Sequence, residues 1–522
     1  MMRRRQDIGC EMLLDRHRAK IVLLDQLAAL LGARPRAHKV VLCHGVFDVV
    51  HPGHLRHLLY AKSKAAVLIC SVTADRWISK GPYRPHVPQD LRAASLALLD
   101  IVDYVVVDDA EGPLSLIARI QPDLYAKGFE YSPAVRPQQI KETAAVEAYG
   151  GEVLFTPGDV VYSSSALIEA AAPDLRWDKL ALLMRRADLT FDLLRNAVLA
   201  MRGQRIHVVG DSIVDVLLRC EMIGASGKTP TISVRRAGRD EFVGGAAVVA
   251  LHARAAGAEV QFSTVLGNDR SGVFILRAMD AAGVRVYPIH EHARPTTVKE
   301  VVVVDGYRIL KIDTVDSQPI SDSILSRLSE QIAETPSVAA VVFSDFRHGI
   351  FNPRTIPTLT AVIPAGGIRA ADSQVASRWG NILDFQGFDF VAANEREARF
   401  ALGDQDSGVR PLAARLYDEA HCGGLLLKLG ARGILGFTAG ADDVERSFVL
   451  DSFATQVIDP VGAGDALLAY ATLALACGAG LPAAVILGSL AAAVECAVDG
   501  NVPVASETIL AKIDEAEREL RV

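Results

Sequence analysis

Two histidines three residues apart, His51 and His54, stand where an apolar run gives way to a helix start. Residues 40–42 are typical of a buried strand, Gly45 allows a turn, and Pro52 favours the first helical position. We therefore expect both imidazoles at the first turn of a helix. Unpaired N–H groups and the positive end of the helix dipole favour phosphate there. Two imidazoles that donate to a triphosphate would complete an anion site.

A second chemical motif lies near the other end of the chain, in Asp459-Pro460-Val461-Gly462-Ala463-Gly464-Asp465-Ala466. The small residues at 462–464 let successive backbone N–H groups turn inward as a nest at a helix N-terminus. Asp465 follows where a carboxylate can reach an acceptor hydroxyl. Phosphoryl transfer requires such a base, together with donors for the charge on the moving phosphoryl group.

The first motif resembles the signature of the cytidylyltransferase-like nucleotidyltransferases, and the similarity continues to about residue 170. It is especially similar to the adenylyltransferase half of the bifunctional heptose-phosphate kinase/adenylyltransferases of lipopolysaccharide synthesis. The resemblance implies that His51 and His54 stabilise the pentavalent phosphate during attack on the α-phosphate of ATP or CTP. It also implies that the nucleotide site includes Gly45, Phe47 and Asp48.

The same resemblance assigns further positions. Lys62 matches a catalytic lysine that contacts phosphate, although a solvated helix lysine is an equal alternative. Basic groups near Arg92 would meet the triphosphate or the incoming sugar phosphate, and Lys127 belongs to a nucleotide-binding Lys-Gly element. A hydroxyl-rich helix start is expected at Ser163, Ser164 and Ser165. These hydroxyls would hold phosphate oxygens or serve only as a helix cap.

The second motif resembles the second signature of the ribokinase-like (PfkB) sugar kinases. This resemblance implies Asp465 as catalytic base and an anion hole at Gly462, Ala463 and Gly464. It also implies that Asn394 and Glu397 organise phosphate and, indirectly, Mg²⁺. Lys428 and Gly430 would lie beside the nucleotide. The residues near the sugar would be Asp211, Asp215, Gly244 and Gly245.

The chain departs from the heptose kinases at positions that touch the substrate. Val248 replaces an asparagine expected to face the sugar, and Asp345-Phe346-Arg347-His348-Gly349 replaces their Asp-Tyr-x-Lys-Gly element. The domain order is also reversed, with the transferase first. Because an unpaired polar group in a binding site changes specificity strongly, a phosphorylated sugar other than heptose is a plausible substrate.

Short apolar strands alternate with amphipathic helices from Lys39 onward, which predicts an α/β fold. We expect strands near 40–43, 66–72, 104–107, 124–127 and 152–156. The predicted architecture is a Rossmann-like nucleotidyltransferase domain followed by a ribokinase-like α/β domain with a small β lid. The expected boundaries are a helical extension at 1–38, with a helix from about Arg18 to Leu31, the transferase at 39–170, a helical linker at 171–204 and the kinase at 205–522.

Composition limits the classes of partner. The 522 residues carry a net charge of −7, which argues against a dedicated nucleic-acid binder, and the chain is too polar along its length for membrane spans. Seven cysteines without a Cys-x-x-Cys pair favour a reducing cytoplasm, and acidic residues interrupt the charged start, so it does not resemble a secretory signal. We expect small-molecule partners and a homo-oligomer.

The leading hypothesis is a bifunctional enzyme for surface glycan synthesis. Its kinase domain would phosphorylate a sugar or sugar phosphate, such as heptose 7-phosphate, with ATP and Mg²⁺. Its transferase domain would join the sugar 1-phosphate to a nucleotide from ATP or CTP. Two alternatives stay open: a cytidylyltransferase for a polyol phosphate fused to an unrelated sugar kinase, and a transferase whose kinase-like domain only binds a ligand.

Overall fold

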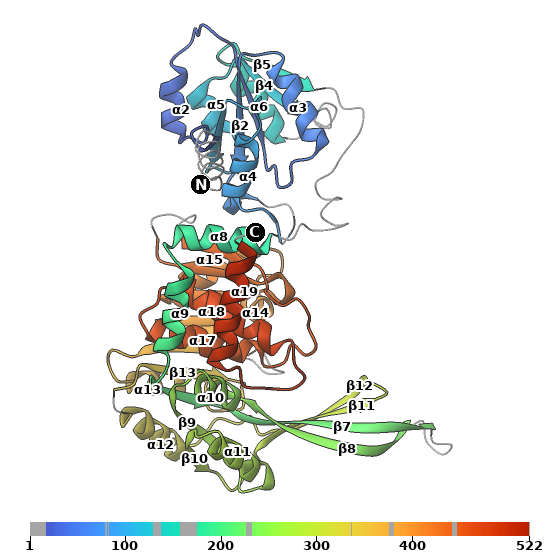
Figure 1. Cartoon of the computed structure of the whole chain (residues 1–522), viewed down its shortest axis with the longest axis vertical. Helices are drawn as coiled ribbons and strands as arrows, with labels where there is room; N and C mark the ends of the chain where they lie inside the picture. The colour runs from blue at the N-terminus through green and yellow to red at the C-terminus, as the bar shows by residue number, and fades with distance from the viewer. Residues whose placement is uncertain are drawn as a thin grey trace, which may run out of the picture. The chain divides into compact units, whose positions relative to one another are not determined.

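The computed structural model describes residues 17–78, 81, 83–128, 137–156, 175–225, 232–335, 337–374, 381–440 and 446–520. The chain divides into two compact units, Met1–Leu175 and Arg176–Val522. Both units combine helices with parallel strands, so the predicted α/β class is confirmed (Figure 1).

A five-stranded parallel sheet forms the first unit, in the order β3-β2-β1-β4-β5. Each strand begins within one residue of its expected start. Apolar residues from both faces of the sheet enter two clusters under the flanking helices. The elements are α2 (Leu24–Leu31), β1 (Val40–Gly45), α3 (Pro52–Lys62), β2 (Val67–Thr73), α4 (Gln89–Ala97), β3 (Tyr104–Asp108), α5 (Leu114–Ile120), β4 (Leu124–Gly128), α6 (Pro137–Glu147) and β5 (Glu152–Thr156).

The helix predicted from about Arg18 to Leu31 is interrupted. Residues 17 and 18 are helical, but α2 begins only at Leu24, because the intervening segment pairs with the edge strand β3. Val22 N–H donates to the Val105 carbonyl at 3.0 Å, and Val105 N–H donates to the Lys20 carbonyl at 2.8 Å. This edge pairing satisfies backbone groups that a helix would have left open on β3.

A nine-stranded sheet forms the centre of the second unit, in the order β10-β9-β6-β13-β14-β15-β16-β17-β18. All neighbours are parallel except the last two pairs. Its strands are β6 (Arg205–Gly210), β9 (Glu259–Leu266), β10 (Arg285–His290), β13 (Ala340–Asp345), β14 (Ile368–Ser373), β15 (Phe390–Asn394), β16 (Gly424–Lys428), β17 (Ile434–Thr438) and β18 (Ser447–Leu450).

Helices cover this sheet, and its parallel strands place their carboxyl ends along one edge, where ligands bind in open α/β sheets (Figure 1). The helices are α10 (Ala246–Ala255), α11 (Arg270–Ala281), α12 (Asp322–Ala333), α13 (Thr355–Ala361), α14 (Glu395–Leu402), α15 (Val409–Ala420), α17 (Ala463–Ala476), α18 (Leu481–Glu495) and α19 (Ser506–Leu520).

A separate four-stranded sheet extends from the second unit, in the order β12-β11-β7-β8 (Figure 1). Its strands are β7 (Ser212–Ala225), β8 (Ile232–Gly245), β11 (Thr297–Val304) and β12 (Tyr307–Thr314). The sequence predicts a small β lid for the kinase domain, and this sheet is the part of the second unit that fits it.

Two helices in the predicted connector, α8 (Arg176–Arg186) and α9 (Phe191–Ala200), pack against the second unit. Lys179 Nζ lies 2.7 Å from Asp451 Oδ1, and Arg195 Nη2 lies 2.7 Å from Asp514 Oδ1. Leu180, with other apolar residues of both helices, joins the core of this unit.

The apolar run that follows Asp465 forms a buried helix. Helix α17 holds residues such as Leu468 and Tyr470 at 0% exposure, and it packs against α18. Among the described residues, every helix is too short or too polar to cross a membrane.

Candidate functional site

His51 and His54 meet at the start of α3, as the spacing predicts. Their ring centroids lie 3.9 Å apart, and the rings are nearly parallel. His51 caps the helix, because its Nδ1 accepts from Gly53 N–H at 3.1 Å, so the ring proton of the neutral imidazole is on Nε2. His54 Nδ1 is buried and has no hydrogen-bond partner among the described residues. Burial, with His51 and His57 nearby, lowers the pKa of His54 to about 4. Two stacked imidazoles thus occupy an anion-favouring helix end.

A polar cluster lies near this site at the carboxyl ends of the strands. His44 Nδ1 lies 3.0 Å from Ser71 Oγ and 3.8 Å from Asp108 Oδ2. Burial lowers the pKa of His44 to about 3, with the charge of Lys127 as a second cause. Burial raises the pKa of Asp108 to about 7, with Asp109 adding to the rise. Both groups are therefore shifted towards their neutral forms.

The structure uses two of the predicted nucleotide residues to hold loops together. Arg92 is 1% exposed, and its guanidinium donates to the carbonyls of Val87 and Thr73 at 2.9 Å and to Asp75 Oδ1 at 2.6 Å. Asp48 accepts from Arg84 Nη1 at 2.7 Å. These contacts hold the buried Arg92 guanidinium within the unit, and its contact with the triphosphate stays a prediction.

Removal of Arg92 should therefore affect folding before it affects nucleotide binding. We expect Arg92→Met to lower the free energy of unfolding of the first unit by about 3 kcal/mol or more, because the backbone carbonyls and Asp75 lose a buried partner. Chemical denaturation of full-length protein measures this loss. Arg119→Met, whose exposed side chain pairs with Asp25, is the control. Unchanged stability with a raised KM for the nucleotide would contradict this structural role.

The other predicted residues of the first unit lie in different places. Phe47 packs against His54, with ring centroids 5.1 Å apart, and Gly45 ends β1. Lys127, at the end of β4, forms an ion pair with Glu142. Lys62 lies at the far end of α3, where it pairs with Asp103, so the structure does not bring it to the histidines. The serines at 163–165 lie outside the described residues.

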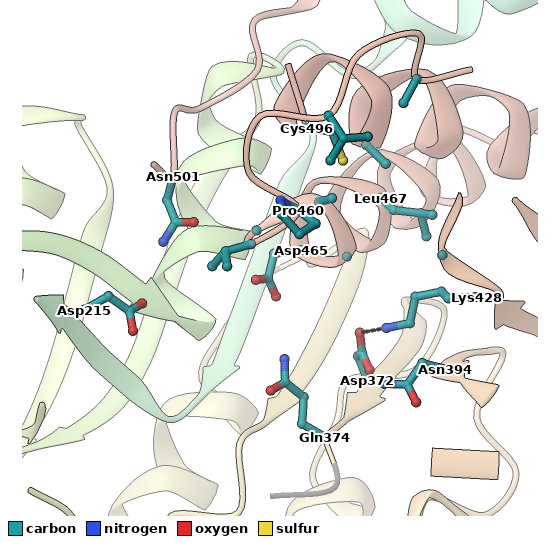
Figure 2. Close-up of a pocket in the computed structure, with 18 of the residues that line it drawn as sticks. Asp215, Asp372, Gln374, Asn394, Lys428, Pro460, Asp465, Leu467, Cys496 and Asn501 are labelled. Atoms are coloured by element: carbon teal, nitrogen blue, oxygen red, sulfur yellow. Dashed lines mark hydrogen bonds and ion pairs between the residues drawn. The ribbon is translucent and has the colours of Figure 1, made fainter. Parts of the chain in front are cut away.

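A cavity of about 980 Å³ in the second unit collects most of the predicted kinase residues. Figure 2 shows Asp465, Asp215, Asn394 and Lys428 lining it from four different elements. The structure thus brings together residues that lie far apart in the sequence.

The loop before α17 forms one wall of this cavity. Gly462 has a φ of +87°, which favours glycine, and a Cβ there would lie 2.6 Å from Asn501 Oδ1. Ala463 and Gly464 begin the helix, so their backbone N–H groups are open to an anion. Asp465 follows in the first turn. Burial raises its pKa to about 8; Asp372 adds to the rise and Lys428 opposes it.

Asn394 and Glu397 form a reciprocal cap at the start of α14. Asn394 Oδ1 accepts from Glu397 N–H at 2.9 Å, and Glu397 Oε2 accepts from Asn394 N–H at 2.6 Å. Glu397 lines the cavity but is 3% exposed, and both its oxygens already accept hydrogen bonds from Asn394. This arrangement fits an indirect, water-mediated role towards Mg²⁺ better than direct coordination.

The predicted sugar residues divide into two groups. Asp215 lines the cavity, and Gly244 leaves it room, since a Cβ at that glycine would lie 2.2 Å from Asp215 Oδ2. Gly245 also lines the cavity. Asp211 does not: its Oδ2 accepts from Phe346 N–H at 3.0 Å and His348 N–H at 3.2 Å. Asp211 thus holds the loop after β13, and its contact with the sugar stays a prediction.

The departures from the heptose kinases have a structural counterpart. Val248, on α10, is 2% exposed and is not among the residues that line the cavity. In the segment 345–349, Asp345 and Arg347 pair with each other at 3.0 Å and both are buried. Phe346 from this segment does line the cavity.

Several residues of the cavity could not be predicted from the sequence motifs. Asp372 lies near the end of a strand that was not predicted, and its only sequence signal is an acidic residue after two alanines. The other missed groups are cations of the four-stranded sheet and polar residues of loops, namely Lys299, Arg308, Lys311, Gln374 and Asn501. Only the folded lid brings these cations to the cavity.

Two family models match the chain in separate regions. The model described as cytidylyltransferase-like matches residues 42–170, and the model described as pfkB family carbohydrate kinase matches residues 204–506. The predicted order, with the transferase domain first, is confirmed.

Curated relatives match the first region. The chain is 39% identical over 138 residues to the bifunctional protein HldE of Geobacter metallireducens, which is 26% of this chain and 27% of the relative. It is 42% identical over 127 residues to HldE of Edwardsiella ictaluri, covering 24% of this chain and 26% of that protein. The chain thus spans about a quarter of the length of these relatives.

Solved structures resemble the second region. Phosphofructokinase-2 from Escherichia coli, solved in complex with substrates and products, is 18% identical, with a TM-score of 0.50. The match covers 60% of this chain and all of that chain, and it indicates a shared fold. Because the pfkB model also matches more than half of the sequence, the chain belongs to the pfkB family of carbohydrate kinases.

Proposed function

We propose that this protein is a bifunctional enzyme that phosphorylates a sugar phosphate with ATP and then transfers a nucleotidyl group to a sugar 1-phosphate. The observation that carries the kinase half is the shared cavity, in which Asp465 and the loop 462–464 lie with three cations of the four-stranded sheet. The paired histidines at the start of α3 support the transferase half.

The kinase residues support in-line phosphoryl transfer. Asp465 accepts the proton of the acceptor hydroxyl, the resulting oxygen attacks the γ-phosphorus of ATP, and ADP leaves. Backbone N–H groups at 462–464 stabilise charge on the moving phosphoryl group. Mg²⁺ neutralises phosphate charge when bound, and Asn394 and Glu397 would hold it through water.

Charge in the cavity favours a phosphorylated acceptor. Lys299, Arg308 and Lys311 line the cavity together with Asp215. Burial lowers the pKa of Lys299, while Asp215 opposes this shift. A neutral sugar needs no such group of cations, whereas the phosphate of a sugar phosphate pairs with them. Heptose 7-phosphate is our first candidate, and other sugar phosphates fit the same chemistry.

Loss of Lys311 should weaken binding of phosphorylated acceptors selectively. We expect Lys311→Met to raise KM for the sugar phosphate about tenfold, because one charge-assisted hydrogen bond is worth roughly 1.5–3 kcal/mol. KM for the unphosphorylated sugar should stay unchanged in the same kinase assay. Lys512→Met, on α19, serves as the matched control. An equal change for both acceptors, or none for either, would refute a phosphate contact at Lys311.

The transferase half uses the first unit. An oxygen of the sugar 1-phosphate attacks the α-phosphorus of the nucleoside triphosphate, and pyrophosphate leaves. His51 and His54 donate hydrogen bonds to the pentavalent phosphate, and the helix end adds its partial positive charge. ATP and CTP are the proposed donors.

A product assay tests both halves. Full-length protein receives a panel of sugar phosphates with ATP and Mg²⁺, and the products are then supplied with each nucleoside triphosphate and identified by mass spectrometry. We expect one acceptor to gain a phosphoryl group and a sugar 1-phosphate to gain a nucleotidyl group from ATP or CTP. No phosphorylated product from any acceptor would overturn the kinase proposal.

Two further expectations accompany this function. A homo-oligomer is supported by apolar residues that β12 exposes, with Tyr307 76% and Leu310 56% exposed. The cytoplasmic location stays a prediction from the sequence. The reciprocal cap of Asn394 and Glu397 and the placement of Asp465 favour a working kinase over a domain that only binds a ligand.

A further inference from the structure

A buried ion pair lies beside the proposed base. Asp372 is near the end of β14 and Lys428 ends β16, with β15 between them. Lys428 Nζ donates to Asp372 Oδ2 at 2.5 Å, and the two side chains are 18% and 8% exposed (Figure 2). Asp372 Oδ1 is buried and lacks a hydrogen-bond partner among the described residues. Buried pairs contribute little net stability because desolvation offsets their attraction, so this pair suggests a role in the site.

The ammonium group lies next to the anion-hole loop. A Cβ at Gly464 would lie 3.6 Å from Lys428 Nζ, and this is the closest atom that it would meet. Asp465 is the next residue of the chain. The Lys428 charge is therefore held at the loop that would receive the phosphoryl group, and Asp372 fixes its position.

Charged groups from four elements face the base. Burial raises the pKa of Asp465, and it is raised further by Asp372 on β14, Asp215 on β7 and Glu495 on α18. Lys428 on β16 is the cation that opposes them. For Lys428 itself, burial alone would lower the pKa, but Asp372, Glu397 and Asp465 raise it above its ordinary value. The lysine therefore stays charged among three carboxylates.

We propose that Asp372 and Lys428 form a positioning pair that holds an ammonium group beside the anion-hole loop and balances the charge around the base Asp465. The proposal rests on the kinase function proposed above. The positive charge of Lys428 favours the ionised form of Asp465, and the negative charge of Asp372 favours its protonated form. The two charges thus have opposite effects on the same proton.

Because the two charges act in opposite directions on the pKa of Asp465, removing each one should shift that pKa in a different direction. Full-length protein is labelled with ¹³C at the aspartate side-chain carboxyl carbon, and the Asp465 signal is identified by its loss in Asp465→Asn. We expect the titration midpoint of this signal to fall in Asp372→Asn and to rise in Lys428→Met, each by about one pH unit. Midpoints that match wild type in both variants, or that move in the same direction, would overturn the proposal.

A matched control pair lies at the opposite edge of the same sheet. Arg369 and Asp389 pair at 3.1 Å near the start of β14 and just before β15. Asp389→Asn and Arg369→Met make the same charge changes there and should leave the midpoint at its wild-type value. If Lys428→Met does not fold, Asp372→Asn keeps the side-chain shape and still decides the question, since an unchanged midpoint in it refutes the pair's influence.

Two more variants separate charge from structure. Lys428→Arg keeps the charge and should hold the midpoint near that of wild type. The double variant Asp372→Asn/Lys428→Met removes both charges, and its midpoint should lie between those of the two single variants. The pH dependence of kcat/KM is measured with the best acceptor of the panel. The pH at which kcat/KM falls on the acidic side should shift in each variant in the same direction as the titration midpoint. If wild type phosphorylates no acceptor, the proposed function fails, while the carboxyl titration still tests the charge balance.

Discussion

Asp465→Asn should abolish sugar phosphorylation and leave nucleotidyl transfer from a supplied sugar 1-phosphate at the wild-type rate. An amide cannot accept the hydroxyl proton, and loss of a general base costs on the order of 10²–10⁴ in rate or more. The two sites also belong to separate units of the chain. Steady-state kinetics of ADP formation and of pyrophosphate release, measured on the same preparation, test both halves of this expectation.

The matched control changes an exposed aspartate of the same unit. Asp322→Asn, at the start of α12, should retain both activities. In wild type, kcat/KM for phosphorylation should rise with pH through about 8, because burial raises the pKa of Asp465 to about 8 and only the ionised carboxylate accepts a proton. Kinase activity of Asp465→Asn within a few-fold of wild type would exclude this residue as the base.

The second large effect concerns the paired histidines. Replacing either His51 or His54 with Ala should lower kcat for nucleotidyl transfer by about 10²–10³ and raise KM much less, since the contact strengthens only in the transition state. The structure supports this expectation, because the two rings stack at a helix end that favours anions. Kinetics with saturating sugar 1-phosphate and varied nucleotide measure the effect.

His44→Ala is the comparison for this pair. Its ring binds Ser71 and lies before the turn, outside the pair, so its replacement should have a smaller effect on kcat. Circular dichroism and thermal unfolding establish that each variant is folded. If His51→Ala and His54→Ala fold and keep kcat within a factor of about three, far below the loss expected of such donors, the histidines do not act on the phosphate.

Local patterns predicted the framework well. The starts of the five strands of the first unit follow from short apolar runs, and the start of α3 follows from Pro52. The glycine-rich loop before Asp465 can be predicted because the full motif from Asp459 to Ala466 is specific, whereas Gly-x-Gly-Asp alone also fits a helix cap. These features depend on neighbours in the sequence, which is why they can be predicted without the fold.

The roles of individual charged residues were harder to predict. Arg92 and Asp211 stand in the right motifs, but distant backbone groups, from Thr73 and from Phe346, occupy their side chains. Asp372 and Lys428 lie on strands that only the sheet order brings together. Which way a charged side chain faces depends on contacts between segments far apart in the chain, and motifs do not encode these.

One comparison tests the bifunctional proposal most directly. Wild type, Asp465→Asn and His54→Ala are each assayed for both reactions under identical conditions. We predict that wild type performs both, that Asp465→Asn loses phosphorylation alone, and that His54→Ala loses nucleotidyl transfer alone. If either variant kept both activities, or if either folded variant lost both, the proposal of two separate active sites in one chain would be contradicted.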